Sequence, residues 1–180
     1  GFGTDLDSLP DEVFSNLTNP SDPKYSGLRN FAKDLTGERR RLYQNGRLGM
    51  IIDGTGDDFK KISMEKKELE AVGYDCYMIF VNTTVEVALS RNEKRDRVLP
   101  EKIVRDSHKS VTQNIGGFQG LFGGSNFTIV DNNKDLDEEA GKKRFNMLVK
   151  QGIGKFIRKP LKNKRGLSWI RKNKILKGKK

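Results

Sequence analysis

Three short apolar runs alternate with stretches of helical periodicity along this chain. The runs lie at 48–52, 77–81 and 127–130, and each is followed closely by asparagine or aspartate. Short runs that are apolar throughout are typical of strands buried on both faces of a sheet. Strands that alternate with helices form right-handed βαβ units. The pattern therefore predicts an α/β fold with a mainly parallel sheet flanked by helices.

Apolar residues at helical spacing precede, separate and follow these runs. The ranges expected to be helical are 10–17, 28–45, 58–72, 84–95, 100–111 and 140–158. Gly46 fits the end of the second helix, and Pro160 ends the last one, after which we expect a basic tail. Three strands are few for a parallel sheet, so a further strand before Asp7 would complete the architecture.

The composition indicates one domain with a modest core and a charged surface. The chain has 180 residues, of which 34% are hydrophobic and 33% charged. No apolar run approaches the roughly 20 residues of a membrane-spanning helix, so we expect no membrane partner. The single cysteine, Cys76, rules out an internal disulfide and favours a reducing, cytoplasmic compartment.

The net charge of +11 is concentrated at the C-terminus. No acidic residue follows Glu139, and residues 142–180 hold 16 Lys and Arg, whereas residues 1–141 hold 19 basic and 24 acidic residues. We therefore divide the chain into a core, 1–141, and a basic C-terminal helix and tail, 142–180. The basic region is either a solvated extension or an electrostatic footprint for nucleic acid or another polyanion, and we favour the footprint.

Polar clusters follow all three apolar runs. They are Asp53–Gly56, Asn82–Thr84 and Asp131–Asn133. Ligands of open parallel sheets bind beyond the carboxyl ends of the strands. Each cluster can instead cap the next helix, and we favour that alternative for Thr83 and Thr84. For Asp53 we favour function, because a carboxylate followed by Gly-Thr-Gly offers a metal or substrate ligand beside a close backbone approach.

A second candidate lies in the charged segment 91–97. Arg91, Arg95 and Arg97 there are either a charged helix end or a clamp for transferring phosphates, whose charge spreads over the phosphoryl oxygens. We expect Asp53, Arg95 and Asp131 to surround one cleft at the strand ends.

These motifs together resemble a known family. The apolar run closed by Asp-Gly-Thr-Gly, the run Val-Asn-Thr-Thr-x-Glu-Val-Ala-Leu-x-Arg-Asn-x-x-Arg and the following Val-Leu-Pro-Glu-Lys-Ile-Val are similar to the zeta-toxin and polynucleotide-kinase-like P-loop kinases, especially those of tailed phages. The resemblance extends from about Asp5 to Asn133. It implies a P-loop kinase-like core.

The resemblance also implies roles for individual residues. Asp7 matches the general base that takes the proton of the acceptor hydroxyl, with Asp5 as a rival. Catalytic contacts to phosphate are implied for Arg95 and Arg97, substrate binding for Asp53, Gly54, Thr55 and Arg91, and nucleotide binding for Asp131 and Asn132. ATP and Mg²⁺ are the cofactors of a complete enzyme, and no residue set predicts a resident metal.

The phosphate-binding motif G-x-x-x-x-G-K-[ST] does not occur in this sequence. Its Gly-Lys pairs, at 141–142, 154–155 and 178–179, are not followed by Ser or Thr. The motif's backbone N–H groups, lysine and hydroxyl hold the ATP phosphates and Mg²⁺. We therefore expect the chain alone to show no phosphoryl transfer from ATP. The first strand and its loop would lie on a segment that is removed, unresolved or supplied by a second polypeptide.

Two functions remain open. The first is an ATP-dependent kinase that phosphorylates a hydroxyl of a nucleic-acid end, a nucleotide or a nucleotide sugar, in the host cytoplasm if a phage encodes it. The second is a non-catalytic, kinase-derived phage structural or nucleic-acid-binding protein, in the cytoplasm or the virion, that uses residues 142–180.

The lone histidine, His108, is expected on a helix surface.

Overall fold

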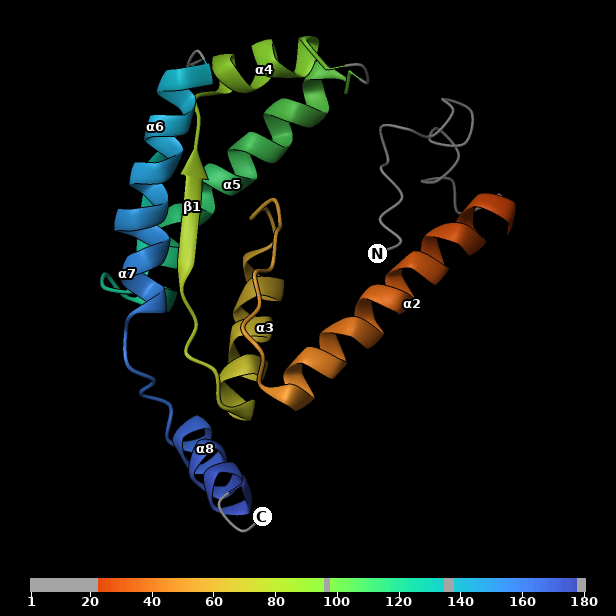
Figure 1. The fold of residues 1–180 in the computed structure, drawn as a ribbon. Coiled ribbons are helices and arrows are strands. Elements are labelled where there is room, and N and C mark those ends of the chain that lie inside the picture. Colours follow the sequence, from red (N-terminus) through yellow and green to blue (C-terminus); the bar gives the residue numbers. More distant parts are fainter. Residues whose placement is uncertain (1–22, 96–97, 135–137, 178–180) are drawn as a thin grey trace. The chain divides into compact units, whose positions relative to one another are not determined.

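The structure, a computed structural model, describes residues 23–95, 98–134 and 138–177 (Figure 1). The predictions made for residues 1–22, the short helix and Asp7 among them, lie outside these ranges. The chain consists of two compact units, with the boundary between residues 51 and 52, and each unit is described by itself. The boundary at 141 and 142 that the charge distribution suggests stays a prediction.

The described part of the first unit is mainly one helix, α2 (Pro23–Gly46). It confirms the helix predicted over 28–45. Arg47, rather than Gly46, takes the left-handed conformation that ends the helix, with a φ of 54°. The Leu48 N–H then donates to the Tyr43 carbonyl oxygen at 3.0 Å, which satisfies one of the last carbonyl groups of α2.

The second unit is mixed α/β and mostly helical. Its elements are α3 (Phe59–Val72), β1 (Met78–Asn82), α4 (Val85–Glu93), α5 (Glu101–Phe122), β2 (Phe127–Asp131), α6 (Glu138–Leu148), a π-helical turn (Val149–Ile153), α7 (Gly154–Ile157) and α8 (Lys164–Lys177). Strands β1 and β2 pair in parallel, from Met78 opposite Phe127 to Asn82 opposite Asp131. The strands predicted at 77–81 and 127–130 and the parallel pairing are thus confirmed.

The strand predicted at 48–52 is wrong. Residues 48–55 have no regular secondary structure, and Ile51 is 94% exposed. A strand needs a neighbouring strand for its backbone hydrogen bonds, and within the described residues the sheet has two strands, β1 and β2. At this run the Leu48 N–H is used to end α2, and Gly49 has no side chain to pack.

A small aromatic core holds one face of the sheet on α5. Phe118 of α5 has no exposed surface and forms a cluster with Phe80 of β1 and Phe127 of β2. The ring of Phe59, at the start of α3, lies 5.3 Å from the ring of Phe118, measured between centroids. This cluster joins both strands and two helices, so it is the main packing centre of the second unit.

The C-terminal region departs from the sequence prediction in two ways. The helix expected over 140–158 is interrupted by the π-helical turn Val149–Ile153, which contains Gly152. The basic tail expected after Pro160 instead contains helix α8, whose N-terminus is held against the C-terminus of α3. The Asn163 side-chain amide donates to the carbonyl oxygens of Glu70 and Tyr74, at 2.8 and 3.1 Å, and its Oδ1 accepts from the Arg165 N–H at 2.9 Å.

Candidate functional site

The polar turns after β1 and β2 lie together because their strands are parallel and in register. Asn82 and Asp131, the last residues of the two strands, are register partners. The Asn132 N–H donates to the Asn82 carbonyl oxygen at 2.8 Å. The carboxyl ends of the two strands therefore form a single edge, where Asn82–Thr84 and Asp131–Asn133 meet.

Asn133 joins these two turns. Its backbone N–H and side-chain amide both donate to Oδ1 of Asp131, at 3.0 and 2.5 Å, and its own Oδ1 accepts from the Thr84 N–H at 2.6 Å. The Thr84 hydroxyl oxygen in turn accepts from the Val87 N–H at 3.4 Å, so Thr84 is the predicted cap of α4. The Asp131 carboxylate is thus partly occupied by structural hydrogen bonds.

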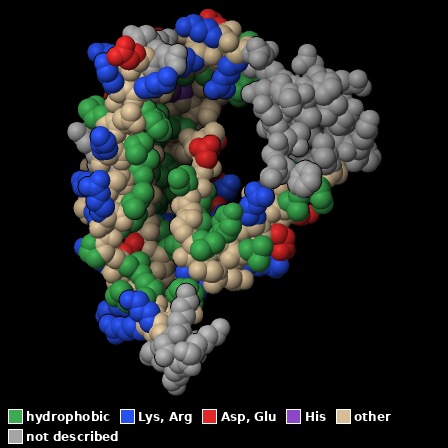
Figure 2. All heavy atoms as spheres, in the orientation of Figure 1, with side chains coloured by type: hydrophobic (Ala, Val, Ile, Leu, Met, Phe, Trp, Pro, Cys, Tyr) green, Lys and Arg blue, Asp and Glu red, His purple; other side chains and the backbone are tan. Residues whose placement is uncertain are grey.

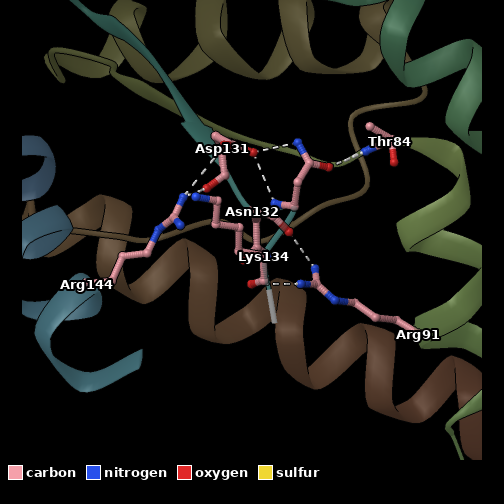
Figure 3. Close-up of polar contacts among 7 residues, drawn as sticks. Thr84, Arg91, Asp131, Asn132, Lys134 and Arg144 are labelled. Atoms are coloured by element: carbon pink, nitrogen blue, oxygen red, sulfur yellow. Dashed lines mark hydrogen bonds and ion pairs between the residues drawn. The ribbon is translucent and has the colours of Figure 1, made fainter. Parts of the chain in front are cut away.

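Two arginines flank the turn after β2. Arg91 of α4 donates to the carbonyl oxygens of Asn132 and Lys134, at 2.8 and 3.5 Å. Arg144 of α6 donates to the Asp131 carbonyl oxygen and lies 4.0 Å from the Asp131 carboxylate (Figure 3). The structure therefore brings together three residues predicted for the site, Arg91, Asp131 and Asn132, and adds Arg144. No sequence signal pointed to Arg144.

His108 connects α5 to the same edge. Its Nε2 lies 2.9 Å from the Thr83 carbonyl oxygen, and because a carbonyl only accepts, this contact requires the proton on Nε2. His108 lies on a helix as expected, but it is half-buried rather than fully exposed. Helix periodicity did not reveal this contact, because it depends on how α5 crosses the end of β1.

Asn92 shapes the segment that follows α4. It is only 6% exposed, its side-chain amide donates to the Leu99 carbonyl oxygen at 2.9 Å, and its Oδ1 accepts from the Leu99 N–H at 3.1 Å. The sequence held a signal for it, because Asn92 falls on the apolar stripe of α4 with Val85, Ala88 and Leu89, where a polar residue needs buried partners. Arg95 lies between Asn92 and Leu99, and its side chain is exposed.

Asn92→Ala is expected to lower the free energy of unfolding by about 1–3 kcal/mol, because both backbone groups of Leu99 lose their partner. Trypsin should also cleave faster between residues 94 and 98. Urea denaturation and timed proteolysis measure the two effects. Asn92→Asp keeps the acceptor for the Leu99 N–H but buries a carboxylate beside the Leu99 carbonyl oxygen, so it should not restore the lost stability. An unchanged cleavage rate in Asn92→Ala would contradict the role assigned to Asn92.

The Asp-Gly-Thr-Gly loop is a second polar segment of the same unit. Asn114 of α5 donates to the carbonyl oxygens of Gly56 and Asp57, at 3.1 and 2.9 Å. The Thr55 hydroxyl donates to the Asp57 carboxylate at 2.5 Å, and this hydrogen bond is the main reason that the pKa of Asp57 lies below its usual value. Asp58 caps α3 by accepting from the Lys61 N–H at 2.9 Å.

Asp53 and Gly54 are exposed at the start of this loop. Within the described residues, no hydrogen bond or ion pair engages the Asp53 carboxylate, and none links Asp53 or Arg95 to the Asp131 network. The expectation that Asp53, Arg95 and Asp131 surround one cleft stays a prediction. Asp7 and Arg97 lie outside the described residues.

Other candidate chemistry is limited. Burial raises the pKa of the Cys76 thiol to about 11, with a further contribution from Glu70, so the thiol is protonated at neutral pH and is a poor nucleophile. Among the residues that the structure describes, no group of three or more His, Cys, Asp or Glu side chains is arranged to hold a metal ion. The same residues include no helix long and apolar enough to span a membrane.

Comparisons with protein-family models, with curated proteins and with solved structures found no match. The structure itself defines a mixed α/β protein with two parallel strands among the described residues, whose polar turns meet at one edge.

Proposed function

We propose that this chain carries the acceptor-binding part of an ATP-dependent phosphotransferase, together with the segment 91–97, whose arginines contact the transferred phosphate. Its acceptor is a hydroxyl of a nucleic-acid end, a nucleotide or a nucleotide sugar. The observation that carries the proposal is the joint placement of Arg91, Asp131 and Asn132 at the carboxyl ends of two parallel strands. This is the edge at which ligands of parallel α/β folds bind.

The charges at this edge suit a phosphorylated ligand. Arg91 and Arg144 place guanidinium groups on either side of the turn at 131–134, and phosphoryl transfer depends on positive charge near the phosphoryl oxygens. In this proposal Arg95 and Arg97 supply further contacts from the segment between α4 and α5. Asp7 takes the proton of the acceptor. ATP and Mg²⁺ are bound by a phosphate-binding loop outside this sequence.

Asp53 offers the clearest test, because its carboxylate is exposed and takes part in no hydrogen bond among the described residues. Asp53→Asn should therefore leave the urea midpoint unchanged while weakening acceptor binding by about tenfold, or about 1.4 kcal/mol. Saturation-transfer NMR and calorimetry on the 180-residue chain would measure binding of a 5′-hydroxyl oligonucleotide, a nucleotide and a nucleotide sugar.

Asp34→Asn is the matched control, since Asp34 is an exposed aspartate on α2 and the chemical change is the same. Binding of at least one acceptor, weakened by Asp53→Asn and not by Asp34→Asn, supports the proposal. Failure of all three acceptors to bind, or equal binding by both variants, counts against it.

A second candidate is a non-catalytic protein that keeps only the architecture of a kinase. The observation in its favour is the structural use of the expected site residues. Arg91 donates to backbone carbonyls, Asp131 accepts from Asn133, and Thr55 donates to Asp57. The acceptor experiment separates the two candidates, because a purely structural edge has no reason to bind a hydroxyl acceptor through Asp53.

A further inference from the structure

Helix α8 carries a basic surface that the proposed phosphotransferase site does not use. The exposed basic residues from α7 to the end of the described region are Lys155, Arg158, Lys162, Lys164, Arg165, Arg171, Lys172 and Lys174. None of them forms an ion pair with another described residue, and the sequence has no acidic residue after Glu139. Figure 2 shows Lys and Arg side chains gathered where α7 is followed by α8.

The start of α8 is fixed to the C-terminus of α3 and to the segment that follows it. Besides the contacts of Asn163, the Lys162 N–H donates to the Asp75 carboxylate at 2.7 Å, and the Arg165 guanidinium donates to the Ala71 carbonyl oxygen at 2.6 Å. Gly166 packs directly on the backbone of Gly73. A fixed helix loses less conformational entropy on binding than a disordered segment of the same charge.

The face of α8 that points away from this junction is basic. Gly166 lies on the packed face, whereas Lys164, Ser168 and Arg171 follow the four- and three-residue spacing of one helix face, opposite Gly166. Lys172 lies beside this row and is also exposed. Lys164 and Arg171 are separated by about 10 Å along the helix axis. One strand of a DNA duplex carries a phosphate for about every 3.4 Å of its own axis.

From these observations we infer that α8 binds the phosphate backbone of nucleic acid, without sequence preference. Phosphates repeat along one line and match a row of cations, whereas a helix that lies on a membrane needs a continuous apolar face opposite its charges. On α8, Gly166 lies opposite Lys164 and Arg171 and packs on the backbone of Gly73, so this part of the opposite face is not available to lipid. The inference does not depend on the proposed phosphotransferase function.

The test compares two triple variants of the full chain that lose the same charge. Arg171→Ala, Lys172→Ala and Lys174→Ala remove cations from α8, and none of the three takes part in the junction with α3. Lys33→Ala, Lys67→Ala and Lys109→Ala remove exposed cations from α2, α3 and α5. Fluorescence anisotropy with a labelled single-stranded oligonucleotide, at about 50 and 200 mM salt, gives the affinity and its salt dependence.

The unaltered chain should bind, with an affinity that falls steeply as salt rises. At low salt the α8 variant should bind at least about tenfold more weakly than the unaltered chain. The slope of its log affinity against log salt should become less negative by about 0.7 for each lost contact. The control variant should stay close to the unaltered chain. Equal loss in both variants, no binding by the unaltered chain at low salt, or binding to phosphatidylserine vesicles in preference to the oligonucleotide would overturn the inference.

Discussion

Replacing Gly166 by alanine is expected to lower the free energy of unfolding by about 3 kcal/mol. The new methyl group would overlap backbone atoms, and no side-chain rotation can relieve such a clash. It would collide with the Gly73 carbonyl oxygen and come within 2.8 Å of the Leu161 side chain. Urea denaturation followed by circular dichroism measures the loss. The fluorescence of Trp169, the only tryptophan and a residue of α8, reports whether the helix leaves its position.

Gly120→Ala is the matched control within a helix. A Cβ at Gly120 of α5 meets no atom within 4 Å, so the change should raise stability by about 0.5–1 kcal/mol through helix propensity. The two substitutions are chemically identical and are expected to act in opposite directions. If Gly166→Ala also stabilised the protein, the close packing of α8 on α3 would be wrong.

Phe118→Ala is expected to cost about 3–5 kcal/mol, a large part of the 5–15 kcal/mol that typically stabilises a domain. Phe118 has no exposed surface and contacts aromatic residues of both strands and of α3, so its loss leaves a cavity at the centre of the core. Thermal and urea denaturation measure the change.

The control is Phe145→Ala on α6, where the side chain is 64% exposed and the expected change is within about 0.5 kcal/mol. Comparable losses for the two variants would show that Phe118 is not the packing centre of the second unit.

Local sequence patterns determined much of the second unit. The apolar runs at 77–81 and 127–130 form strands, helical periodicity located α3, α4 and the start of α5, and Thr84 caps α4 as its side chain predicts. The meeting of the turns after β1 and β2 also follows from sequence, because residues that follow parallel strands lie at one edge of the sheet. These features depend on a residue and its near neighbours, so one sequence suffices to predict them.

Other features were decided by contacts between distant segments. The run at 48–52 is as apolar as a strand, yet a strand also needs a partner for its backbone, and periodicity does not say whether one is present. In the same way, the composition of 160–180 is that of a tail. Helix α8 is fixed by Asn163, which bonds residues 93 and 89 positions earlier in the chain, and by the backbone contact of Gly73 with Gly166. Such contacts leave no local pattern, because the energy that orders the segment comes from surfaces remote in sequence.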